Sequence, residues 1–427
     1  MKPSTLPTYQ SIENRISFQQ VFANPGFNGH NAGMSSRFLP VIESIATETP
    51  EYTIQQSDAA QVVANLSNLE HNRHRIEKLY RNTQIDTRHL AINLLSDEAI
   101  AFSKSTGNIE SRMQRYQKYA VPLAERVAQQ AIESASVQMK THECGEPDSD
   151  IKDSIHQIVF VSSTGFVAPG VDVALIEKLG LRRDIARVTV NFMGCAAAMN
   201  GLRVACDHVR AYPTHKVLLV CLELSSVNAA FEDNLNDVII HSIFGDGCAA
   251  VVVGAREGAD AMGGGNIVIH DHLSYLVEDT QDGITLGVRD NGITCELSRQ
   301  LPDYIEVGVG PIIERYLMSH QLKKDDINLW AVHPGGTRII QKVQQSLGLS
   351  DDQVCDSWSI LRQYGNMLSP SVLFVIERML QRLRQNPCSS QRSSQKLSSS
   401  PQVKALTGLA FSFSPGVGIE GILFQVI

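Results

Sequence analysis

The sequence predicts an α/β protein in which strands and helices alternate along the chain. Short apolar segments that are rich in Val and Ile and bounded by turn residues are typical of buried strands. Between them lie segments whose apolar residues recur at helical spacing. In the first half we expect strands at 155–163, 186–194, 215–224 and 248–255, and helices at 122–139, 171–180 and 196–212. This order is typical of a parallel α/β layer.

A second set of elements follows, which favours two similar halves. Helices are expected at 309–320, 336–348 and 369–385, and strands at 327–334, 404–413 and 420–427. Each half ends in an apolar strand that contains a glycine, CAAVVVGA and GILFQVI, although this repeat signal is weak on its own. The predicted halves cover residues 37–265 and 266–427.

Two polar segments stand apart from this pattern. Residues 1–36 contain a cluster of Asn, Gly and Pro, which indicates an N-terminal arm rather than a packed element. Residues 386–402 are rich in Ser and Gln, and a strand of the same half follows them. We therefore expect a flexible surface insertion there rather than a linker between domains.

Composition excludes several functional classes. A chain of 427 residues with 43% hydrophobic residues can bury a large core. Its net charge of -8 provides no basic field for duplex nucleic acid, so any phosphate recognition must be local. No segment has the roughly 18 consecutive apolar residues of a membrane span, and the N-terminus lacks a signal-peptide core. We expect a soluble, cytoplasmic protein without stable membrane insertion.

The eight cysteines show no C-x-x-C pair and no regular spacing, which argues against a metal site or a disulfide framework. Cys195 differs from the others because it follows an apolar strand and Gly194, at the start of an Ala-rich helix. A helix N-terminus stabilises a thiolate through its free N–H groups. A cysteine packed beneath a helix is an equally acceptable interpretation of this feature alone.

Two further residues are candidates for the same chemistry. His333 lies in LWAVHPGGTRII, at the end of an expected strand, where its ring could face a cleft. Asn366 lies in QYGNMLSPSVLF, just before an expected helix. Taken singly, a buried hydrogen-bonded histidine and a turn asparagine are the commoner interpretations.

The motifs around these three residues resemble those of the type III polyketide synthases, the chalcone and stilbene synthase superfamily. The sequence motifs on which the resemblance rests are, in order, GCAAAMNGLR, SIFGDGCAAVVVG, AVHPGGTRII, YGNMLSPSVLFV and FSFSPGVGIEG. The resemblance covers about residues 37–427 apart from the Ser-rich insertion. It implies a thiolase fold, in which two similar βαβαβαββ halves stack in five layers (αβαβα).

The resemblance also implies an acyltransferase that condenses coenzyme A thioesters without a metal or other cofactor. Cys195 would carry the acyl starter. His333 and Asn366 would stabilise the enolate that forms when malonyl-CoA loses carbon dioxide. Phe244 matches the family's aromatic gatekeeper, although ordinary core packing would also explain it.

Coenzyme A brings phosphates to the entrance of such a site. Arg75, Lys78 and Arg81 occur at helical spacing, and the first two match family positions that bind the nucleotide end. A solvated charged helix face is the alternative.

Small residues near the expected cavity indicate an enlarged starter tunnel. By the resemblance, Thr164, Ala168, Ser225, Cys295 and Leu368 line the tunnel or cavity, and Ala168 and Cys295 replace bulkier residues of the plant enzymes. We therefore expect a medium- or long-chain fatty acyl-CoA starter and an alkylpyrone or alkylresorcinol product. A short starter, or malonyl-CoA alone in a phloroglucinol-type synthesis, is the main alternative. The resemblance further implies a homodimer, with the loop at 166–170 near the partner's cavity.

Three other functions remain open. A β-ketoacyl-acyl-carrier-protein synthase III uses the same three residues, but the residues after His333 and Asn366 fit the polyketide synthases better. A cysteine hydrolase could use Cys, His and Asn, but the expected topology speaks against it. A non-catalytic acyl-binding scaffold of the same fold would not require all three residues.

Overall fold

The computed structural model describes residues 37–66, 69–94, 96–99, 108–142, 150–230, 235–261, 267–385 and 405–427. The N-terminal arm and the Ser-rich insertion predicted above lie outside these ranges. Among the helices that the structure describes, none combines the length and hydrophobicity needed to cross a membrane.

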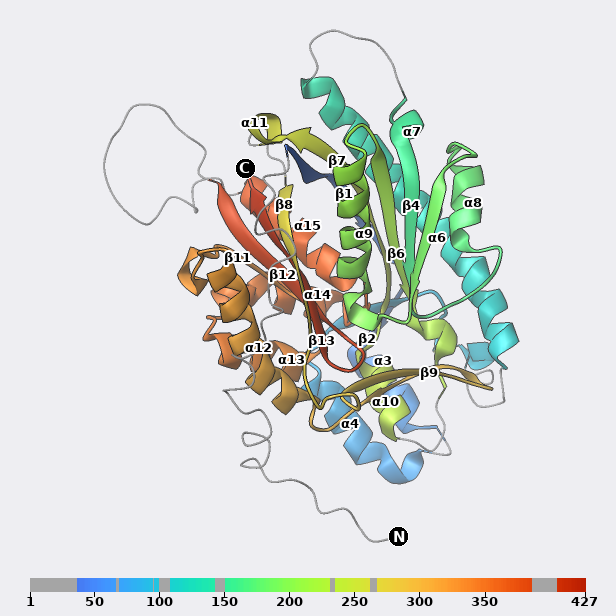
Figure 1. Ribbon diagram of the computed structural model, residues 1–427. Helices are drawn as coiled ribbons and strands as arrows, with labels where there is room; N and C mark the ends of the chain where they lie inside the picture. Colours follow the sequence, from blue (N-terminus) through green and yellow to red (C-terminus); the bar gives the residue numbers. More distant parts are fainter. Residues whose placement is uncertain are drawn as a thin grey trace.

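Nine strands hydrogen-bond in the order β11-β12-β13-β8-β1-β7-β6-β4-β5 (Figure 1). The first half supplies β1 (Phe38–Glu48), β4 (Ile155–Ser162), β5 (Ala186–Asn191), β6 (Lys216–Leu224) and β7 (Asp246–Glu257). The second half supplies β8 (Ile267–Leu276), β11 (Leu329–Val332), β12 (Leu406–Ser414) and β13 (Gly418–Val426). The halves meet where Val41 and Ile42 pair with Val268 and Ile267.

The two halves repeat one pairing pattern. In the first, β4 and β6 are parallel, whereas β7 and β1 follow in antiparallel order. In the second, β11 and β12 are parallel, and β13 and β8 again follow in antiparallel order. The expectation of a parallel layer was therefore correct only for the strands linked by crossover helices. Antiparallel neighbours need no crossover helix, and among these pairs β12 and β13 are joined by a short turn.

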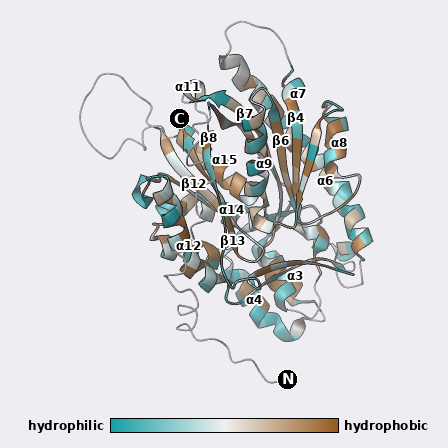
Figure 2. Ribbon diagram, viewed as in Figure 1, coloured by the Kyte–Doolittle hydropathy of each residue, from teal (hydrophilic) through white to brown (hydrophobic). Residues whose placement is uncertain are grey.

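Helices form three layers around these strands. In the middle layer, α9 (Ala197–Ala211) and α15 (Ser371–Gln385) share one hydrophobic core with strands of both halves. The outer face of the first half is covered by α6 (Ile109–His142) and α8 (Val171–Lys178), and that of the second by α12 (Leu301–Ser319) and α13 (Thr337–Leu347). Figure 2 shows that the central strands β4 and β6 are mainly hydrophobic, as burial between helix layers requires. This arrangement is the predicted αβαβα stack.

The middle layer is closely packed. A Cβ atom on Gly201 of α9 would lie 2.7 Å from Leu219, closer than real Cβ contacts, and 3.1 Å from Val161. Glycine at this position therefore lets α9 lie directly against β4 and β6. The N-terminal end of α9 is consequently fixed relative to both strands.

Smaller elements close the end of the sheet near this helix terminus. The hairpin of β9 (Ile284–Arg289) and β10 (Gly292–Leu297) contacts α10 (Leu235–Ile243), and α10 packs on α3 (Gln56–Ala64) and α4 (Arg73–Asn82) (Figure 1). A further helix, α14 (Cys355–Tyr364), packs against α15.

Candidate active site

Cys195 lies in a tight turn between β5 and α9. Phe192 and Gly194 have φ angles of 57° and 56°, in the left-handed region that favours glycine. The Gly194 N–H donates to Ser163 Oγ at 3.0 Å, which ties the turn to the end of β4. The chain then enters a short 3-10 helix (Gly194–Ala196) that continues into α9. The thiol therefore lies at the N-terminal end of a helix, as predicted.

Asn366 is held beside this thiol by its backbone and its side chain. Its N–H donates to Ile243 O at 2.9 Å, and its own carbonyl accepts from the Gly245 N–H at 3.0 Å. Its Oδ1 accepts the Leu368 N–H at 2.8 Å. Its Nδ2 lies 3.7 Å from Cys195 Sγ. Nδ2 also donates to Gly335 O at 3.3 Å, so the amide N–H groups face this carbonyl and the sulfur.

His333 follows β11 directly and is fully buried, with 1% of its surface exposed. Its N–H donates to Phe411 O at 3.0 Å, which fixes the backbone. Neither ring nitrogen has a hydrogen-bond partner, although the Asn366 side chain is near enough to affect the pKa of the ring. An unpartnered buried imidazole has two nitrogens available to a ligand.

Burial sets the charge of each group in the empty site. It raises the pKa of the Cys195 thiol, and the contact with Asn366 offsets only part of this increase. Burial also lowers the pKa of His333 to about 3, against a smaller opposing effect of Asn366. Both changes favour the neutral form, because a single charge is poorly solvated there.

An apolar cavity adjoins this site and contains about 360 Å³ of empty space, part of it open to solvent. Phe244, Cys295 and Leu368 pack together with Cys195 along it. Five predicted gate or tunnel residues line this cavity: Phe244, Thr164, Ser225, Cys295 and Leu368.

Ala168 does not join them. It is exposed, in the loop between β4 and α8, and it is not part of the lining of this cavity. Thr164, only four residues earlier, does line the cavity. The predicted role of Ala168 in widening the tunnel stays a prediction.

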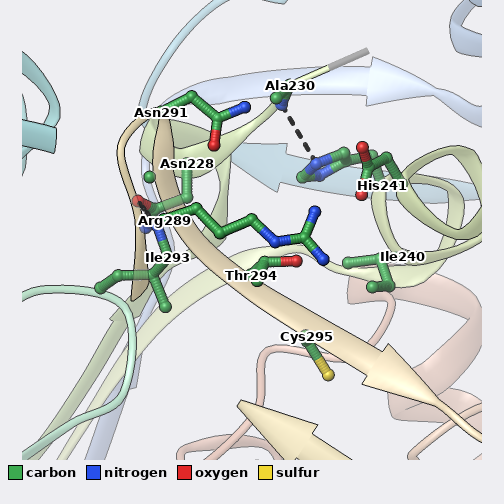
Figure 3. A pocket seen from close by; sticks show the side chains of 11 residues that line it. Asn228, Ala230, Ile240, His241, Arg289, Asn291, Ile293, Thr294 and Cys295 are labelled. Atoms are coloured by element: carbon green, nitrogen blue, oxygen red, sulfur yellow. Dashed lines mark hydrogen bonds between the residues drawn. The ribbon is translucent and has the colours of Figure 1, made fainter. Parts of the chain in front are cut away.

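A second, polar chamber continues from the apolar cavity, and six residues line both spaces (Figure 3). Asp237, Arg289 and Asn291 line the polar chamber alone. His241 lines both, and its Nε2 accepts the Ala230 N–H at 3.2 Å. Burial lowers the pKa of His241 to about 3, so this ring is neutral. Figure 3 shows Arg289 extending into the chamber from β9, and this side chain also pairs with Glu296 at the surface.

Arg75, Lys78 and Arg81 are all exposed on α4. The buried face of this helix carries Ile76 and Tyr80 and packs toward α10, which in turn lines the cavity. The three cations therefore lie on the outer side of an element adjacent to the site and do not line the cavity. Their predicted role in phosphate binding stays a prediction. Elsewhere in the described part of the chain, no group of three or more His, Cys, Asp or Glu side chains could hold a metal ion.

Comparison with known proteins identifies relatives along almost the whole chain. Residues 30–257 match the family description "Chalcone and stilbene synthases, N-terminal domain", and residues 269–427 match the corresponding C-terminal domain. The chain is 45% identical over 389 residues to an alpha-pyrone synthesis polyketide synthase-like protein, Pks18, of Mycobacterium tuberculosis, covering 91% of this chain and 92% of that one. A 1,3,6,8-tetrahydroxynaphthalene synthase of Streptomyces peucetius is 28% identical, with coverage of 81% and 87%. The crystal structure of PKS-I from the brown alga Ectocarpus siliculosus superposes with a TM-score of 0.81 at 40% identity, covering 92% of this chain and 100% of that one.

Sequence reasoning missed Glu223, which lies behind the apolar cavity. This carboxylate is fully buried and accepts hydrogen bonds from Ser369 Oγ and Thr164 Oγ1, each at 2.7 Å, and from the Ser163 N–H at 2.9 Å. Burial raises its pKa from 4.5 to about 7, and the hydrogen bonds offset part of this increase. A single acidic residue inside the apolar strand HKVLLVCLEL was the signal that could have identified it.

Glu223 should make stability depend on pH. Between about pH 4.5 and 7 the folded state retains a proton that the unfolded state has released, so the free energy of unfolding falls as pH rises. The difference in pKa corresponds to about 3 kcal/mol. We expect Glu223→Gln to remove this part of the decrease. The measurement is urea unfolding of both proteins at pH 5 and pH 8. An identical pH dependence in the two proteins would show that Glu223 does not titrate in this range.

Proposed function

Because the chain belongs to the chalcone and stilbene synthase family, the type III polyketide synthases, we propose that Cys195, His333 and Asn366 catalyse decarboxylative condensation of malonyl-CoA with an acyl starter. The observation that carries this assignment is the 3.7 Å contact between Asn366 Nδ2 and the Cys195 thiol, beside an imidazole with two unpartnered nitrogens. These groups supply a nucleophile, a proton acceptor and oxyanion donors, as acyl transfer requires.

In the loading step, the Cys195 proton moves to His333 as sulfur attacks the thioester carbonyl of the starter. The two charges appear together, so each offsets the burial that disfavours the other. The helix N-terminus adds a further favourable interaction with the thiolate. The C–S bond to coenzyme A breaks, and the imidazolium proton leaves with the coenzyme A thiolate. The acyl group remains on Cys195.

In the extension step, the bond between the malonyl carboxylate and its α-carbon breaks and carbon dioxide leaves. The electron pair forms an enolate whose oxygen accepts hydrogen bonds from His333 and the Asn366 amide. The enolate carbon then attacks the acyl carbonyl on Cys195, and the C–S bond to the enzyme breaks. Loss of carbon dioxide drives the step, so the proposed chemistry needs only the coenzyme A thioesters. Arg75, Lys78 and Arg81 are the proposed contacts for their phosphates.

The proposed starter is a medium-chain fatty acyl-CoA, with an alkylpyrone as the product. Support comes from the mainly apolar cavity beside Cys195 and from the pyrone synthesis named for the Mycobacterium relative. The polar chamber favours a second candidate, a short starter or malonyl-CoA alone. A long alkyl chain would reach Asp237 and Arg289, whose desolvation is unfavourable.

Replacing the nucleophile tests the catalytic assignment. We expect Cys195→Ala to lower product formation by about 10³-fold or more, because the covalent attachment point is lost. Release of carbon dioxide from malonyl-CoA should continue, since His333 and Asn366 remain. Intact-protein mass spectrometry should show no acyl adduct. The matched control is Cys355→Ser, at a partly exposed cysteine of α14. Normal product from the alanine variant would disprove the assignment.

Kinetics across starter lengths test the proposed substrate. We expect kcat/KM to rise from acetyl-CoA to a medium-chain acyl-CoA by up to about fourfold per methylene, the factor that corresponds to about 0.8 kcal/mol. Cys295→Phe should shift the optimum to shorter chains because it fills the cavity wall. Met318→Phe, at an exposed position of α12, is the control. A flat profile in the unaltered enzyme would favour the short-starter alternative.

The proposed assembly is a homodimer that pairs through β5. Among the described strands β5 contacts only β4, and four of its six residues are exposed, so one edge is available for pairing. Exposed Phe166 lies beside Phe192, with ring centroids 6.3 Å apart, next to this edge.

Sedimentation equilibrium tests the dimer. We expect a dimer at micromolar concentration, and dissociation in Thr189→Asp because the same charge would enter the interface from both copies. Thr285→Asp, on the exposed side of β9, is the control. A monomeric unaltered protein would contradict the proposal.

A further inference from the structure

Ser225 lines the apolar cavity and has a hydroxyl group that makes no hydrogen bond. It begins the short 3-10 helix that follows β6 (Ser225–Asn228), and only 5% of its surface is exposed. Its Oγ has no hydrogen-bond partner, although it lines the cavity beside Cys195. The neighbouring Ser226 shows the opposite behaviour, because its Oγ and its N–H both donate to Asp246.

The other buried polar side chains of this cavity hold its walls together. Thr164 Oγ1 donates to Glu223 and accepts the Leu224 N–H at 2.9 Å. Asn228 donates to Thr164 O at 2.7 Å and accepts the Ile293 N–H at 3.2 Å. Ser163 accepts from Gly194. Within the described residues that line this cavity, Ser225 therefore carries the buried hydroxyl that has no structural bond.

A fatty acyl starter cannot satisfy this hydroxyl. Its single oxygen is the thioester carbonyl at the carbon that reacts with Cys195, so it has no acceptor further along the chain. An unpartnered buried hydroxyl is unfavourable because it has lost its hydrogen bonds to water. One condensation releases a β-ketoacyl-CoA from Cys195. When its acyl group returns to Cys195 and coenzyme A leaves, the chain in the cavity carries a second oxygen on its third carbon.

We propose that the Ser225 hydroxyl donates a hydrogen bond to the 3-oxo oxygen of the extended chain, so that the cavity binds a β-ketoacyl intermediate in preference to a plain acyl starter. This inference rests on the proposed condensation chemistry. It makes Ser225 a specificity-determining residue, which favours further extension of a chain already extended once over the loading of a new starter.

Competitive loading tests the preference without requiring extension. The enzyme is given equal decanoyl-CoA and 3-oxodecanoyl-CoA without malonyl-CoA, and the two adducts on Cys195 are counted by intact-protein mass spectrometry at early times. We expect Ser225→Ala to lower the ratio of 3-oxodecanoyl to decanoyl adduct on the order of tenfold, the fold-change that a lost buried hydrogen bond produces. Ser225→Thr, which keeps the hydroxyl, should retain the ratio. With malonyl-CoA present, the alanine variant should also release shorter products.

A control variant separates this role from a general effect of polarity, and a second variant is available if Ser225→Ala is unstable. Thr294→Val removes a hydroxyl from the partly exposed stretch of the same cavity wall and should retain the ratio. If the alanine variant is too unstable to load either thioester, Ser225→Cys replaces it, because cysteine is similar in size and a weak donor.

Each outcome decides a different claim. An unchanged ratio in Ser225→Ala, or an equal decrease in Thr294→Val, would overturn the role of Ser225. If neither thioester modifies Cys195 in the unaltered enzyme, the proposed function itself fails.

Discussion

The close packing of α9 against strands of both halves is the constraint on which the rest of the structure depends. Gly201 lets this helix lie against Val161 and Leu219, so its N-terminal end cannot shift along β4 and β6. Cys195 lies at that end, and the bond from Gly194 to Ser163 fixes the turn. The partner helix α15 begins just after Asn366 and shares the same core. Two helices packed in one layer thus bring a thiol and an amide together from positions 171 residues apart.

Burial disfavours the charged forms of the two groups in this site. It raises the pKa of Cys195 and lowers the pKa of His333, so neither is favoured as an ion by itself. A substrate carbonyl changes this balance because negative charge moves onto an oxygen that donors can reach. The unpartnered nitrogens of His333 are therefore unfavourable in the resting protein and favourable in the reaction. Glu223 follows the same rule, since its raised pKa lets it lie behind the cavity without a permanent charge at low pH.

Most of the fold could be predicted because its central elements have clear hydrophobic patterns. The predicted strand at 155–163 became β4 and the helix at 196–212 became α9, each within two residues of its observed bounds. Two central strands were missed, β1 and β8, because each contains polar residues such as Glu43 and Asp271. Tertiary partners satisfy these residues: Lys216 bonds Glu43, and His320 bonds Asp271. Such pairs join segments that are distant in the chain, so the local hydrophobic pattern cannot predict them.

For the site, too, some residues could be identified from local sequence motifs, and others only from long-range contacts. Cys195, His333 and Asn366 lie in motifs that could be read directly, and the structure brings them together. The role of Ala168 stays a prediction, because an aligned position does not show whether a loop turns inward. Glu223 and the unused hydroxyl of Ser225 depend on which neighbours satisfy which atoms, and only three-dimensional contacts reveal that.

Some polar side chains around the cavity have hydrogen-bond partners within the protein, and others have none. The first group holds the wall together, and the second group is available to a ligand. Protein atoms are the hydrogen-bond partners of Thr164, Asn228 and Ser163. These bonds fix the positions of the three side chains. His333 and Ser225 have buried polar atoms without hydrogen-bond partners. A ligand with matching oxygens would complete them, and this would offset the cost of burying them unpaired. The two unsatisfied positions then correspond to two substrate oxygens, one at the reacting carbonyl and one further along the chain. A polyketide acquires the second oxygen only by condensation, so the cavity is complementary to the intermediate rather than to the starter.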